Sequence, residues 1–112
     1  MVTRFEKYLD PSESLIIADA YLPVLEAKKV PKSVSLRYEH LIEMLWNEHV
    51  LARREKGARW IGFIQGQLEF MGIYSIDDMR GHVTEARKIS RGEATLDALK
   101  LIMEKEWKSP KI

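Results

Sequence analysis

The stretch RWIGFIQGQLEFMG, residues 59–72, places three glycines among aromatic, aliphatic and glutamine residues. Its apolar residues recur every three or four positions, as they do on one face of a helix. That face consists of Trp60, Ile64, Leu68 and Met71. The spacing predicts a helix from about Ala58 to Met71 that turns this face to the core and stops at Gly72.

Two glycines lie inside this predicted helix. Each interior glycine costs about 1 kcal/mol relative to alanine, so the pair needs a structural reason. Small residues four positions apart let another backbone approach, so we predict that Gly62 and Gly66 contact a crossing helix of this chain or of a second copy. The alternative is a groove that admits a ligand, with Gln65 and Glu69 as its polar residues. Gln67 lies on a more apolar side, where its amide is expected to have a hydrogen-bond partner.

The region before this stretch predicts two helices. Asp10 is placed to cap the first, which runs to about Lys29, and Pro23 is expected to kink or split it. The first helix is apolar on most of its circumference, and the second has two apolar stripes. Helices of this kind require burial on two sides, which favours an oligomer.

The second helix is predicted between Ser33, a plausible N-cap, and Lys56. Gly57 is then expected to end it in the left-handed conformation. His49 lies within its main apolar stripe and is expected to be a hydrogen-bonded core residue.

The region after residue 72 predicts two more helices. Ser75 is expected to cap the first of them, and acidic residues follow it at the positive end of the helix dipole. Ser90 and Glu93 suggest a capping box for the last helix, which ends near Lys108. The expected core faces are Ile76, Met79, Val83 and Ala86 in the first and Leu96, Leu99, Met103 and Trp107 in the second.

Five helices joined by short turns predict an all-α, single-domain bundle over residues 1–112, with residues 1–9 and 109–112 frayed. The chain has 112 residues, too few for two independent cores. It has 18 basic and 17 acidic residues, so its overall charge favours no polyanionic partner. It has no cysteine and no expected membrane span or signal peptide, which suits a protein of the cytoplasm.

One candidate for metal or acid–base chemistry lies on the helix after Ser75. Asp78, His82 and Glu85 share one of its faces, and carboxylate and imidazole groups are common metal ligands. A further ligand from another helix would be needed, so the candidate is weak and we predict no cofactor. Phosphate-binding loops, nucleophile elbows, dinucleotide fingerprints and the paired acidic motifs of helical nucleotide pyrophosphohydrolases are all missing.

Basic residues form two clusters despite the near-zero net charge. The first comprises Arg53, Arg54, Lys56 and Arg59, and the second Arg80, Arg87, Lys88 and Arg91. If the two helices from Ala58 and from Ser75 pack antiparallel, Arg59 and the group from Lys88 to Arg91 come to the same end and form an anion site. We favour the simpler interpretation that cations gather at helix C-termini. A helix-turn-helix is disfavoured because Asp77 and Asp78 would face the DNA phosphates.

The stretch from Arg59 to Asp78 resembles a pattern found in small phage- and prophage-encoded proteins of unassigned role. The matching residues are Arg59, Trp60, Gly62, Phe63, Gln65, Gly66, Gly72, Ile73, Ser75, Ile76, Asp77 and Asp78. The resemblance covers about a fifth of the chain and implies a phage-related accessory protein, without an activity.

These observations predict a non-enzymatic, oligomeric binding protein with a macromolecular or small anionic partner. One alternative is a DNA-binding regulator that uses the two basic clusters. A second is a metal-dependent hydrolase that acts through Asp78, His82 and Glu85.

Overall fold

The computed structural model describes residues 9–30 and 36–110, and this part of the chain is all-α without a strand. The predicted fold class is confirmed, although the described residues form six helices instead of five. These are α1 (Pro11–Lys28), α2 (Leu36–Leu45), α3 (Glu48–Leu51), α4 (Arg54–Phe70), α5 (Ile76–Ser90) and α6 (Leu96–Glu106). None of them is long and apolar enough to cross a bilayer.

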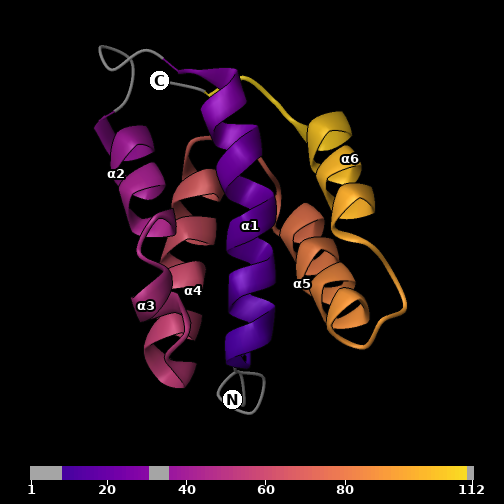
Figure 1. The fold of residues 1–112 in the computed structure, drawn as a ribbon. Helices are drawn as coiled ribbons and strands as arrows, with labels where there is room; N and C mark the ends of the chain where they lie inside the picture. Colours follow the sequence, from indigo (N-terminus) through magenta and orange to yellow (C-terminus); the bar gives the residue numbers. More distant parts are fainter. Residues whose placement is uncertain (1–8, 31–35, 111–112) are drawn as a thin grey trace.

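Helix α1 is the centre of the bundle. It lies between α2, α3 and α4 on one side and α5 and α6 on the other, and it contacts all five (Figure 1). Its start is fixed as predicted, because Asp10 and Glu13 each accept a hydrogen bond of 3.0 Å from the other's backbone amide. Because α1 contacts helices on both of its sides, its burial is satisfied within one chain, and α1 does not itself require a second copy.

Pro23 does not split α1, which is one continuous helix. Pro23 lies on the exposed side of α1, together with Asp19 and Glu26. A proline at this position removes the amide that would bond the Asp19 carbonyl. On the solvent side water can replace that bond, so the helix continues.

The predicted second helix is wrong in its extent, because the chain breaks it twice between Leu36 and Lys56. Asn47 Nδ2 donates to the Glu43 carbonyl (2.6 Å), and such side-chain bonds compete with helical ones. His49 is exposed and is not a core residue. The proposed cap Ser33 lies outside the described residues.

Gly57 does not end a helix but lies inside α4. A Cβ atom at this position would collide with the backbone carbonyl of Leu51 at the end of α3. Gly57 therefore allows the two helices to approach each other closely, which is the role that the sequence suggested for Gly62 and Gly66.

The turn between α4 and α5 matches the prediction. Gly72 has a φ of 77°, and Ser75 caps α5 in a capping box with Asp78. Met79 and Ala86 are buried in the core as expected. Ile76 is instead 56% exposed at the first position of α5, so the prediction is wrong there.

The predicted cap of the last helix is also wrong. Ser90 is the final residue of α5, and the chain turns at Gly92, which has a φ of 78°. Thr95 caps α6 by accepting a hydrogen bond of 3.2 Å from the amide of Ala98. Glu93 lies in the turn and pairs with Arg91.

Candidate binding groove

A groove lies between α4 and α5, which run in opposite directions on the two sides of α1 and make little direct contact (Figure 1). Its volume is about 1060 Å³. One wall comes from α4, from Ala58 to Glu69, and the other from α5, from Ile76 to Arg87. Leu9, just before α1, contributes to one end and is buried despite its place near the chain terminus.

Gly62 and Gly66 face this groove. A Cβ atom built on either residue meets no described atom within 4 Å. The prediction that another helix of this chain crosses these glycines is therefore wrong for the part of the chain that the structure describes. The alternative derived from the sequence, a groove with Gln65 and Glu69 among its lining residues, matches the geometry.

The groove is apolar at depth and basic at its edges. Ile61 and Met79 are buried, whereas Arg59 and Arg80 are exposed. Together with Arg87 they put three guanidinium groups along the lining, against a single lining carboxylate. This composition favours a ligand with both apolar and anionic groups.

The arginines are held to different extents. Arg87 Nε lies 3.6 Å from a carboxylate oxygen of Glu13, whose side chain is mostly buried. Arg80 lies 3.6 Å from Asp77, but both side chains are largely exposed, so this ion pair contributes little. Arg80 therefore remains available to an incoming anion.

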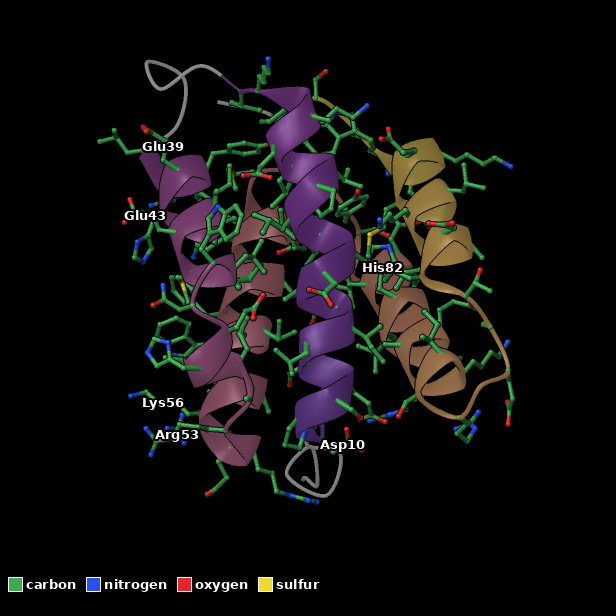
Figure 2. The ribbon with its side chains drawn as sticks, viewed as in Figure 1. Asp10, Glu39, Glu43, Arg53, Lys56 and His82 are labelled. Atoms are coloured by element: carbon green, nitrogen blue, oxygen red, sulfur yellow. The ribbon has the colours of Figure 1, made fainter. Side chains whose placement is uncertain are left out.

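Gln65 connects the groove to a buried chain of hydrogen bonds. Its Nε2 donates to Tyr21 Oη (3.1 Å), and that hydroxyl is 2.9 Å from His82 Nδ1. On its other side, His82 Nε2 is 2.7 Å from a carboxylate oxygen of Glu106. The chain thus links α4, α1, α5 and α6, with His82 between α1 and α6 (Figure 2).

His82 is completely buried, and burial lowers its pKa. The carboxylates of Glu106 and Asp78 act in the opposite direction without outweighing this desolvation. A neutral imidazole has one donor and one acceptor nitrogen, and both are used here. His82 is consequently a structural residue at neutral pH.

The predicted metal candidate is not supported. The described residues hold no group of three His, Cys, Asp or Glu side chains that could bind a metal ion. Asp78 caps α5 and accepts from Lys108 (3.3 Å), while Glu85 pairs with Lys88 (3.4 Å). Both nitrogens of His82 are committed to other helices, which helical spacing alone could not reveal.

The two basic clusters meet only in part. Arg59, Arg80 and Arg87 line one groove, whereas Lys88 and Arg91, which antiparallel packing was expected to bring to Arg59, are absent from its lining. Two members of the second cluster are paired with neighbours on their own segment, Lys88 with Glu85 and Arg91 with Glu93.

The remaining residues of the first cluster lie outside the groove. Arg53, Arg54 and Lys56 are exposed at the start of α4 and do not line it (Figure 2). The eight basic residues therefore do not form one anion site.

The carbonyl oxygen of Gln67 lacks the partner that was expected for its amide. Its Oε1 is buried and makes no hydrogen bond to the described residues. It shares a side of α4 with Phe63 and Phe70, which contact His40 and Arg37 of α2. Gln67 is therefore separate from the groove.

Comparison with known proteins adds no relative. No family model, curated protein or solved structure matches this chain. The resemblance to phage-encoded proteins accordingly remains a prediction from the residues in α4 and the following turn.

Proposed function

We propose that this is a non-enzymatic binding protein whose groove between α4 and α5 receives an acidic, amphipathic helix of a protein partner. The observation that carries this proposal is the exposure of Gly62 and Gly66 in a groove lined by Arg59, Arg80 and Arg87. Gly81 also lacks neighbours, so the glycines alone do not define a site; the surrounding arginines and apolar residues do.

The length of the groove favours a helical segment over a small molecule. The lining runs over 12 residues of each helix, from Ala58 to Glu69 and from Ile76 to Arg87, which is about 18 Å at a rise of 1.5 Å per residue. Amphipathic helices bind other proteins by placing an apolar face in such grooves. The missing Cβ atoms at Gly62 and Gly66 would let the partner's backbone approach α4.

The charge of the groove favours an acidic partner. Arginine is well suited to interfaces, because its planar group binds carboxylates through two hydrogen bonds. The lining has three arginines and one carboxylate, Glu69. Carboxylates along the edges of a bound helix would therefore be complementary to the groove.

DNA binding is the second candidate, and its support is weaker. Arg53, Arg54 and Lys56 lie outside the lining that holds the groove arginines, so the described residues form no single basic track. A DNA gel shift that weakens steeply with salt would support this alternative. Absence of binding at low salt would exclude it.

The experiment uses a fluorescein-labelled, 18-residue peptide with leucine and alanine on one helical face and glutamate elsewhere. Fluorescence anisotropy should detect binding, and the same peptide with lysine in place of glutamate should not bind. Arg80→Glu should lower the affinity for the acidic peptide about tenfold. Lys100→Glu, on α6 outside the groove lining, should leave the affinity unchanged.

The location of the peptide is tested separately by amide chemical shifts. The largest changes should occur at Gly62, Gly66 and Thr84, all of which line the groove. No binding at millimolar peptide, or changes confined to other helices, would contradict the proposal.

We further propose that the protein is a cytoplasmic, phage-related accessory protein and forms a homo-oligomer. The resemblance of residues 59–78 supports the first part. For the oligomer, exposed apolar side chains such as Trp46 and Phe70 provide a surface for association. Light scattering should give at least twice the mass of one chain, and a monomer at tens of micromolar would exclude the oligomer.

A further inference from the structure

The buried hydrogen bonds next to the groove have a defined direction. Gln65 Nε2 donates to the Tyr21 hydroxyl, whose own proton is then free to bond His82. His82 Nδ1 must accept this proton when the imidazole is neutral, so its Nε2 carries the hydrogen that is donated to Glu106. Every donor in this chain of hydrogen bonds therefore points from the groove toward α6.

This direction fixes the orientation of the Gln65 amide. Its nitrogen is turned to Tyr21, which is 1% exposed, while the Gln65 side chain lines the groove. Rotation of the amide would bring its carbonyl oxygen against a hydroxyl oxygen whose proton is already donated. Two acceptors would then face each other, which is unfavourable in a buried place.

We infer that Gln65 determines the specificity of the groove, because the buried chain of Tyr21, His82 and Glu106 holds its amide with the carbonyl oxygen toward the ligand. This inference rests on the proposed function. It adds that the acidic helix carries a neutral hydrogen-bond donor on its apolar face, such as the amide of glutamine or asparagine. Tyr21 and His82 are positioning residues that act through Gln65.

Protonation of His82 would reverse the chain. Nδ1 would then donate to Tyr21, and the tyrosine proton would turn to Gln65, which accepts it only after its amide has rotated. The groups facing His82 are Tyr21 from α1, Glu106 from α6, Tyr74 from the turn before α5, and Asp78 on α5 itself. Lys108 is the cation paired with Asp78.

The binding test compares two acidic peptides that differ in a single neutral side chain. The acidic 18-residue peptide is prepared with glutamine at successive apolar-face positions, and each version is matched by one with the γ-methyl ester of glutamate, which has no donor. At one position the glutamine peptide should bind about tenfold more tightly than its ester counterpart at pH 7.5. The quantity measured is the ratio of the two dissociation constants. A ratio within twofold at every position would overturn the inference.

Two buried tyrosines provide matched variants. Tyr21→Phe removes the hydroxyl that orients Gln65, so the ratio between the two peptides should fall to about one. Tyr74→Phe should keep the ratio, because its hydroxyl donates to the Met103 carbonyl and not to the chain. Gln65→Leu should abolish the ratio as Tyr21→Phe does, and it leaves the buried tyrosine in place.

A measurement without peptide separates this inference from the proposed function. Nitrogen NMR should find His82 protonated at Nε2, and the Gln65 amide signals should titrate with His82 in the unchanged protein and in Tyr74→Phe. In Tyr21→Phe the Gln65 signals should no longer follow His82. An Nδ1-protonated His82 at pH 7.5 would overturn the inference even if the acidic peptide binds. If the NMR result is as expected but no peptide binds, the orientation of the Gln65 amide is supported and the proposed function is contradicted.

Discussion

At the scale of single residues, the glycines of α4 have two different roles. Gly57 faces the backbone of Leu51, whereas Gly62 and Gly66 face open space. An alanine side chain thus adds only helix propensity at positions 62 and 66, but adds a collision at position 57. The same substitution is therefore expected to stabilise the protein at positions 62 and 66 and to destabilise it at position 57.

Gly62→Ala and Gly66→Ala should each raise the free energy of unfolding by about 0.5–1 kcal/mol, because glycine in a helix interior is less favourable than alanine by that amount. Urea denaturation measures the change. Gly81→Ala is the control, since Gly81 lies in α5 and also has no neighbour within 4 Å of a Cβ position. Destabilisation at 62 and 66 but not at 81 would indicate that a helix of a second copy packs there.

Gly57→Ala should lower the free energy of unfolding by about 1–3 kcal/mol, the usual cost of overpacking. The colliding atom is the Leu51 backbone carbonyl, which cannot move away as a flexible side chain can. The same urea experiment measures it. A variant as stable as the unchanged protein would show that α3 and α4 can separate without cost.

At the scale of helices, their ends depend on single hydrogen bonds. Ser75 and Thr95 accept bonds from the first turns of α5 and α6, at 3.0 and 3.2 Å. Ser90, a cap candidate in the sequence, makes an exposed bond of 3.1 Å to Ser12 instead. The structure thus separates two serines that looked alike in the sequence.

Ser75→Ala should lower the free energy of unfolding by about 1 kcal/mol, because it removes an N-cap. Ser90→Ala should change it by less than about 0.5 kcal/mol, as is usual for an exposed surface residue. Thermal and urea denaturation of both variants measure the difference. A larger loss at Ser90 than at Ser75 would contradict the assigned helix boundaries.

At the scale of the whole molecule, the chain of hydrogen bonds through His82 connects four helices and titrates. The lowered pKa of His82 means that the folded protein favours the neutral imidazole. In the unfolded chain the same imidazole takes up a proton near its ordinary pKa of 6.5. The stabilisation is thus complete above pH 6.5. It declines as the pH falls from there to the pKa of the folded state.

The free energy of unfolding should therefore fall between pH 7.5 and 5, with a slope of at most about 1.4 kcal/mol per pH unit from this one proton. The carboxyl groups of Asp10 and Asp78 have pKa values lowered from 3.8, so they take up protons mainly below pH 5. Urea denaturation at several pH values measures the slope. His82→Gln should flatten it, and the exposed control variant His49→Gln should not.

The sequence by itself determined the features that depend on neighbours within a few residues. The cap at Asp10, the stop at Gly72 and the cap at Ser75 each involve a bond or a backbone angle inside one turn, and all three were predicted. The all-α class followed from the helical spacing between such signals. The antiparallel arrangement of α4 and α5 was raised as a condition and is present (Figure 1).

Only the tertiary structure decided which surfaces meet. Gly57 and Gly62 both lie inside α4, but the end of α3 covers Gly57 and leaves Gly62 open. His82 looked like a ligand beside Asp78, yet α1 and α6 enclose it and use both of its nitrogens. Gly57 meets a residue of another helix, and the partners of His82 lie 24 and 61 positions away in the chain. Periodicity within one helix carries no information on such contacts.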